Sequence, residues 1–158
     1  MQLDVHEQKV IDIVDRVGWM VMQVSPNQGD EDPRWFAYTI GLPVTFGWPE
    51  LICFGLDVDV MTAVLNNAVQ ELKTKEPVAG LLLTEVAEGY LARLEVFPKK
   101  YFREHLGWAM WFADYRGLKP QQFSCLQCMW PDKLGRFPSD AGCDPEVRKN
   151  QAPVSQMH

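Results

Sequence analysis

The chain has 158 residues, of which 47% are hydrophobic and 11% aromatic, and its formal net charge is -6. A domain of this size can bury enough apolar surface to fold without a metal or disulfides. Its acidic balance argues against a nucleic-acid ligand, because phosphates attract clustered Lys and Arg. The sequence shows no signal peptide and no apolar run of the roughly 18 residues that cross a bilayer. We therefore expect a cytoplasmic protein with reduced cysteines and no membrane contact.

The first quarter of the chain predicts one helix and two strands. Residues 3–16 place apolar side chains at helical spacing and are followed by Gly18, which predicts an amphipathic helix that stops there. Residues 18–24 then predict a strand. Residues 25–33 are polar and bounded by Pro and Gly, so we expect a mobile loop. Residues 34–40 are rich in aromatic and β-branched types and predict a second strand.

The next segment contains the most hydrophobic strand of the chain. Residues 41–49 are punctuated by Gly and Pro and predict an irregular connection. Residues 50–56 are apolar on both faces, so we expect this strand to lie centrally in the sheet. Asp57 or Asp59 then caps a helix that runs to about Lys75.

A hairpin is predicted where residues 80–87 and 90–97 flank a Glu-Gly turn. In its second strand one set of side chains is apolar, namely Tyr90, Ala92, Leu94 and Val96. The alternate side chains, Arg93 and Glu95, are charged. We therefore expect this strand to bury one face and expose the other.

The remaining sequence predicts an aromatic helix at 101–115, with a break at Gly107, and a last strand at 122–130. After Pro131 the chain is rich in Pro, Gly and charge, so we expect it to be irregular. Residues 149–158 are expected to be a disordered tail.

These elements predict an α+β fold with a mainly antiparallel sheet of about six strands and two to three packed helices. The sheet is expected to be antiparallel because several connections between strands are too short for parallel crossovers. We expect residues 1–148 to form a single globular domain.

Polar and aromatic residues at strand ends form the candidate binding site: Tyr38, Thr39, Glu50, Gln127, Trp130 and Asp132. Glu50 opens the most hydrophobic strand, where a carboxylate must find partners or rise in pKa. Strand ends with irregular connections are where sites are often built, and we expect these six residues to surround one hollow. In the structural alternative, Glu50 and Asp132 accept backbone N–H groups and fix loops.

Other chemically suggestive residues carry less weight. Cys125 and Cys128 are three apart in a strand, so their sulfurs should point to opposite faces, and we expect free thiols without a metal. His105 precedes the predicted helix break and could act as a general base, or as a cation favoured at a helix C-terminus. The sequence contains no nucleophile elbow and no phosphate-binding glycine loop.

Several separated motifs of the chain occur in an order that resembles a known bacterial family. In sequence order they are Gly18-Trp19, 36–42, Pro49-Glu50-Leu51, Gln127, Trp130-Pro131-Asp132 and 135–138. The pattern resembles the family catalogued as domain of unknown function 4262 over roughly residues 5–138. Members often have His before Pro-Glu-Leu, where this chain has Trp48. The resemblance implies a shared fold and shared positions, without an activity.

Two main functions are compatible with the sequence. The first is a non-enzymatic binding protein that grips a basic partner protein, for example an immunity-type protein that neutralises a toxin, because the N-terminal third is acidic. The alternative is a small-ligand enzyme of split-barrel-like architecture that binds flavin, with Tyr38, Thr39, Glu50 and Gln127 as polar anchors. A purely structural or regulatory oligomer is a third possibility.

Overall fold

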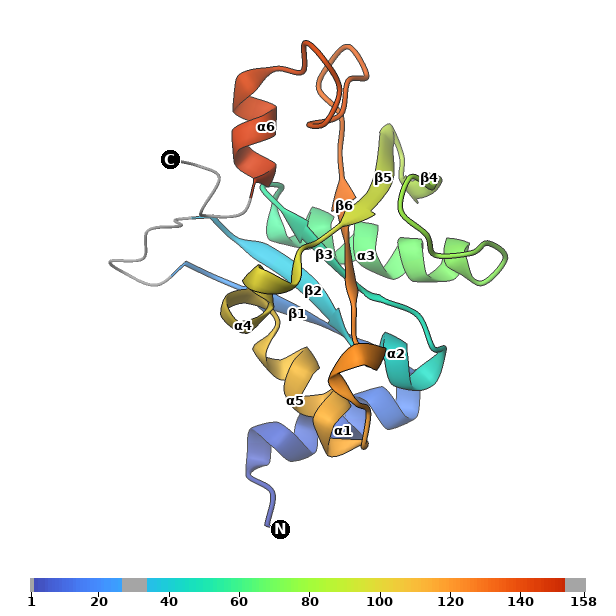
Figure 1. Ribbon diagram of the computed structural model, residues 1–158, viewed down its shortest axis with the longest axis vertical. Coiled ribbons are helices and arrows are strands. Elements are labelled where there is room, and N and C mark those ends of the chain that lie inside the picture. The colour runs from blue at the N-terminus through green and yellow to red at the C-terminus, as the bar shows by residue number, and fades with distance from the viewer. Residues whose placement is uncertain (1, 27–33, 153–158) are drawn as a thin grey trace.

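The protein forms one six-stranded sheet in a computed structural model that describes residues 2–26 and 34–152 (Figure 1). Its strands are β1 (Met20–Val24), β2 (Phe36–Ile40), β3 (Glu50–Phe54), β4 (Leu82–Ala87), β5 (Tyr90–Val96) and β6 (Cys125–Met129). Their order across the sheet is β1-β2-β3-β6-β5-β4. Every neighbouring pair is antiparallel except β3 with β6, which confirms the α+β class and the mainly antiparallel sheet.

The described residues contain six α-helices, more than the two to three expected. They are α1 (Val5–Val17), α2 (Leu42–Thr45), α3 (Val58–Leu72), α4 (Phe102–His105), α5 (Gly107–Tyr115) and α6 (Pro145–Gln151). Two short 3-10 helices, η1 (Lys99–Tyr101) and η2 (Pro120–Gln122), precede α4 and β6. The undercount has two sources: the expected aromatic helix is divided at Leu106, and α2 and α6 lie in segments predicted to be irregular.

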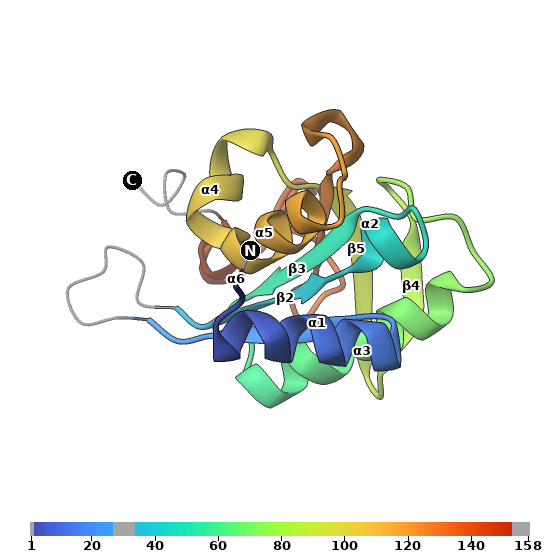
Figure 2. The same ribbon diagram turned by 90° about the horizontal axis from the view of Figure 1, so that it is seen from below.

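The sheet separates two hydrophobic cores, one packed with α3 and the other with α1, α4 and α5. Figure 2 shows α3 and the α4–α5 pair on opposite sides of the sheet. Helix α3 packs its apolar side, including Leu65 and Val69, against Leu51 and Cys53 of β3. The opposite face of β3 presents Ile52 to the second core, which the other three helices cover. Each face of the sheet is therefore an apolar layer.

Strand β3 lies at the centre of the sheet, as its two apolar faces predicted. All five of its residues are buried. It pairs with β2 on one side and, in parallel, with β6 on the other. The long connection through α3, the β4–β5 hairpin and α5 provides the length that a parallel crossover needs. The short connections elsewhere in the sheet therefore do not predict the parallel pair of β3 with β6.

Local sequence rules account for the first helix. Asp4 accepts a hydrogen bond from Glu7 N (2.7 Å), and the Glu7 carboxylate accepts from Asp4 N (3.0 Å), which forms a capping box. Gly18 ends the helix with φ 106°, a conformation that favours glycine.

The C-terminal segment is more ordered than the composition predicted. Helix α6 begins behind the N-cap Asp144 and extends through 149–151, where Gln151 is 1% exposed. The expected disordered tail is therefore wrong for 149–151, and 153–158 lie outside the described residues. Most of the loop predicted to be mobile, 27–33, also lies outside them.

The β4–β5 hairpin has only part of the expected pattern. Ala92 and Leu94 are buried against the α3 face, but Tyr90 (39% exposed) and Val96 (64% exposed) are not. A bulge lies between Leu83 and Ala87 in β4. The bulge and the strand end explain why strict alternation fails there.

Candidate functional site

Glu50 lies at the junction of β2, α2 and β3, and its carboxylate is enclosed. The residue is 1% exposed, and the backbone N–H groups of Gly41 (2.8 Å) and Leu42 (3.2 Å) donate to it. The Thr39 hydroxyl donates to its Oε1 atom (2.8 Å). Burial raises the pKa of Glu50 to about 8, against the lowering effect of these three hydrogen bonds. The group therefore fixes the start of α2.

Tyr38 lies beside this junction and reaches a different helix. Its hydroxyl accepts a hydrogen bond from Trp108 N (3.2 Å), near the start of α5. Burial raises the pKa of Tyr38 to about 12, the Trp108 N–H lowers it, and the Glu50 charge raises it. Tyr38 thus joins β2 to α5.

Gln127 and Trp130 hold the C-terminal helix at the other end of β3. Gln127 Nε2 donates to Gln151 O (2.6 Å). The side chain of Gln151 accepts from Trp130 N (2.8 Å) and donates to Trp130 O (2.7 Å), and Trp130 Nε1 donates to Phe54 O (2.8 Å). We call these four residues the α6 clasp.

Asp132 organises the turn that follows β6. Its carboxylate accepts from the backbone N–H groups of Leu134 (2.9 Å), Arg136 (2.9 Å) and Asp144 (3.0 Å) and from Arg136 Nε (3.1 Å). Partial burial raises the pKa of Asp132, but the hydrogen bonds outweigh it and lower the value to about 2. The carboxylate is therefore ionised and fully engaged.

The six residues expected to surround one hollow are divided among three places. Tyr38, Thr39 and Glu50 gather at the β2–α2–β3 junction, Gln127 and Trp130 belong to the α6 clasp, and Asp132 organises its own turn. The expected common hollow is therefore wrong. Glu50 and Asp132 both accept main-chain N–H groups, as expected if these two carboxylates fix loops.

His105 and the cysteine pair take structural positions. The His105 ring is buried and packs edge-on against Phe36, Phe54 and Phe97, with Nδ1 2.9 Å from a backbone carbonyl of the preceding turn. Cys125 and Cys128 belong to the cores on opposite faces of the sheet, which confirms their predicted divergence. The four cysteines are free.

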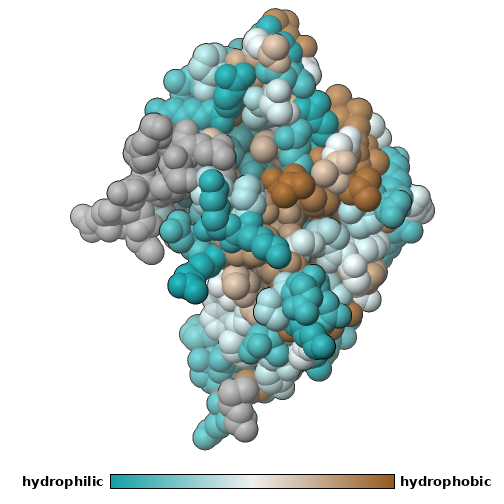
Figure 3. All heavy atoms as spheres, viewed as in Figure 1, coloured by the Kyte–Doolittle hydropathy of each residue, from teal (hydrophilic) through white to brown (hydrophobic). Residues whose placement is uncertain are grey.

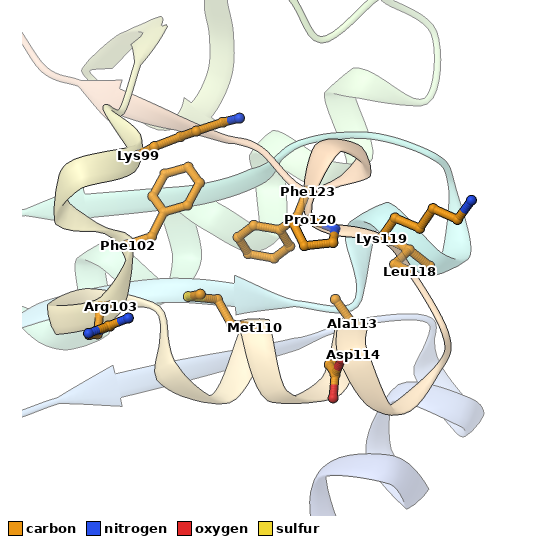
Figure 4. Close-up of a pocket in the computed structure, with 10 residues that line it drawn as sticks. All are labelled: Lys99, Phe102, Arg103, Met110, Ala113, Asp114, Leu118, Lys119, Pro120 and Phe123. Carbon is orange, nitrogen blue, oxygen red and sulfur yellow. The ribbon is translucent and has the colours of Figure 1, made fainter.

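The structure presents a different candidate, a pocket of about 460 Å³ between α4, α5 and η2 (Figure 4). The side chains that converge on it are apolar: Phe102, Met110, Ala113, Leu118, Pro120 and Phe123. The volume is in the range of small-molecule sites, and such walls suit the apolar part of a ligand.

Three cations surround this hollow. Lys99 of η1, Arg103 of α4 and Lys119 beside η2 line the pocket, and Figure 4 shows them on different sides of it with their charged ends directed outward. None of the ion pairs among the described residues involves these three side chains. Asp114 also contributes to the pocket, but its carboxylate points away from the hollow. We call this site the basic-rimmed pocket.

Sequence reasoning missed the basic-rimmed pocket because its parts come from four short elements within residues 99–123. A local signal was present. In this acidic chain, basic residues recur on both sides of the aromatic helical segment, at Lys99, Lys100, Arg103, Arg116 and Lys119. Only the fold shows that three of them surround one hollow.

A family model described as a domain of unknown function, DUF4262, matches residues 13–144. The chain belongs to this family. The match confirms the resemblance to this family. In this chain the Glu50 junction, the α6 clasp and the Asp132 turn connect elements of the fold. No curated protein and no solved structure matches the chain. Within the described part of the chain, none of the helices has the length and apolar character needed to cross a bilayer.

Proposed function

We propose that this DUF4262 protein binds an amphipathic anion, a carboxylate with an apolar body, in the basic-rimmed pocket. The observation that carries the proposal is the combination of an apolar hollow with three cations that have no ion pair among the described residues. The apolar body gains from burial, at about 25 cal/mol per Å². The carboxylate gains from the positive rim.

The proposed role is binding without a chemical step. The hollow is lined mostly by carbon-rich side chains, and Figure 4 shows the carboxylate of Asp114, the acidic residue of the lining, turned away from it. A ligand seated there would meet no activated nucleophile. We also propose that the protein acts in the cytoplasm, where thiols stay reduced. An immunity-type role toward a basic partner protein, and a flavin site in a split-barrel-like enzyme, stay predictions.

Calorimetric titration with decanoate tests the proposal, with decyltrimethylammonium as the matched cation. We expect decanoate to bind with a dissociation constant on the order of 10–100 µM, weakening as salt is added, and the cation not to bind measurably. Equal affinity for the two detergents would show that the rim charges do not select the ligand.

Variants then locate the binding. Lys119→Glu should weaken decanoate binding by roughly fivefold, because it replaces an attraction with a repulsion. Met110→Glu, in the apolar wall, should abolish binding. Lys133→Glu makes the same charge change at an exposed residue outside the pocket and serves as the control. If Lys133→Glu weakens binding as much as Lys119→Glu, the pocket is not the site.

A further inference from the structure

A second pocket, of about 270 Å³, lies where β5 and β6 meet the C-terminal segment that ends in α6. Its lining includes Glu95, Val96, Gln127, Met129, Ser139 and Arg148, and we call it the strap pocket. The lining also has the apolar residues Pro98, Met129 and Pro138, and Figure 3 shows hydrophobic residues over the region of β5 on the face turned to the viewer. The pocket therefore combines apolar surface with several polar groups.

Gln127 supplies a buried hydrogen-bond acceptor to this pocket. The residue is 1% exposed, and its Nε2 donates to Gln151 O (2.6 Å), which fixes the orientation of the amide. No described residue donates to its Oε1 atom. Every fully buried side-chain nitrogen or oxygen in the described part of the chain has a hydrogen-bond partner. Oε1 therefore keeps a small contact with solvent, and the strap pocket is a space that Gln127 lines.

Glu95 supplies a second acceptor. Its Oε1 atom accepts from Arg93 Nε (3.1 Å) and from Ser139 Oγ (2.9 Å). Its Oε2 atom accepts no hydrogen bond from the described residues, and the side chain is 27% exposed. Since Glu95 and Gln127 are register partners on adjacent strands, the two acceptors lie on one face of the sheet.

The charges around the pocket cancel. Arg93 pairs with both Glu95 (3.1 Å) and Asp140 (3.2 Å). Arg148 donates to the backbone carbonyls of Pro138 (2.9 Å) and Asp140 (3.3 Å). Two carboxylates thus balance two guanidinium groups, and the pocket favours neither an anion nor a cation.

We infer that the strap pocket binds a small neutral hydrogen-bond donor, a primary carboxamide on an apolar group. Its N–H groups would donate to Gln127 Oε1 and Glu95 Oε2, and its apolar part would contact Met129 and Pro138. This site is separate from the basic-rimmed pocket, and the inference does not rest on the proposed function.

A nuclear magnetic resonance titration with benzamide, benzoate and benzylamine tests this inference on the wild-type protein. Benzamide should shift the side-chain amide signal of Gln127 in a saturable way. It should bind at least fivefold more tightly than benzoate, which cannot donate, and than benzylamine, which brings an uncompensated charge. Saturable binding of benzoate with equal affinity, or an unmoved Gln127 signal, would overturn the inference.

Met129→Trp fills the strap pocket from a half-buried position on the same face of the sheet as Gln127, so the fold should tolerate it. We expect at least a tenfold loss of benzamide affinity. Leu134→Phe, at a residue that is 75% exposed and outside the pocket lining, should leave the affinity unchanged. Met110→Glu should also leave benzamide binding intact, so failure of the decanoate site and failure of this site are distinguishable. Unchanged affinity in Met129→Trp would place benzamide elsewhere.

Discussion

The hydroxyl of Thr39 lies 2.8 Å from Glu50 Oε1 and also accepts a hydrogen bond from Leu51 N (2.9 Å). The backbone pairing of β2 with β3 ends one residue before Thr39, at Tyr38↔Ile52. A side chain thus continues the strand pairing where the backbone stops, and it holds a buried carboxyl group against the start of α2. The ionisation of Glu50 is consequently part of the folding equilibrium.

Glu50 should make stability fall as the pH rises. Its pKa is about 8 in the folded protein and about 4.5 without the fold. Between these values the folded state holds a proton that the unfolded state has released, so this contribution is fully present below pH 4.5 and lost through pH 8. We expect wild type to lose up to about 4 kcal/mol of unfolding free energy, relative to Glu50→Gln, between pH 5 and pH 8.

Chemical denaturation of both proteins at pH 5 and pH 8 measures this difference. Glu50→Gln keeps the size of the side chain but cannot titrate. Parallel pH profiles for the two proteins would contradict the assignment.

Asp132 should make the stability of the folded protein fall as the pH is lowered, in a more acidic range than Glu50. Its pKa is lowered from 3.8 to about 2, so its contribution is present above pH 3.8 and is lost as the pH falls toward 2. Asp132→Asn should therefore melt several degrees below wild type at pH 6, and the gap should close as the pH approaches 2. Melting curves across this range test it, and a gap that is constant with pH would show that the charge is not involved.

Gln151 should anchor α6 through its side chain. Gln151→Ala removes the partners of Trp130 N and Trp130 O, and backbone groups left unpaired in a partly buried place cost about 2–4 kcal/mol together. We expect this loss in denaturant unfolding, with faster amide exchange in α6. Glu146→Ala, on the same helix but exposed, is the control. Equal effects of the two changes would mean that the clasp does not hold the helix.

Gly55 should resist substitution for two reasons. Its φ is +85°, and an added Cβ would lie 2.6 Å from Asn150 O in α6. Gly47 has a similar φ of +75° with no atom within 4 Å of an added Cβ. Both Gly→Ala changes should cost about 1 kcal/mol from the backbone, and Gly55→Ala should cost at least about 1 kcal/mol more from the close contact. Comparable unfolding free energies for the two variants would argue against the close packing of α6 on Gly55.

The sequence predicts the elements that are stabilised by their own residues. Helix α1 has its cap at Asp4 and its stop at Gly18, and β3 is apolar on both faces, so each is recognisable locally. Helices α2 and α6 are not, because their stability depends on side chains from distant positions. The start of α2 needs Glu50, and α6 is held at Gln151 by Trp130 and Gln127.

The same reasoning explains the outcome for the candidate site. A carboxyl group at the first residue of the most hydrophobic strand is unusual. In the structure, Glu50 receives hydrogen bonds from donors within the protein. The basic-rimmed pocket depends on how Lys99, Arg103 and Lys119 of separate short elements are placed around one hollow. The spacing of these three residues along the sequence does not predict that placement.

The binding of an amphipathic anion is tested most directly on Met110, whose side chain points into the basic-rimmed pocket (Figure 4). With isotope-labelled methionine methyl groups, a decanoate titration should shift the Met110 signal in a saturable way and leave the buried Met61 signal in place. A Met110 signal that does not move while decanoate binds, or that moves equally with decyltrimethylammonium, would contradict the proposed function.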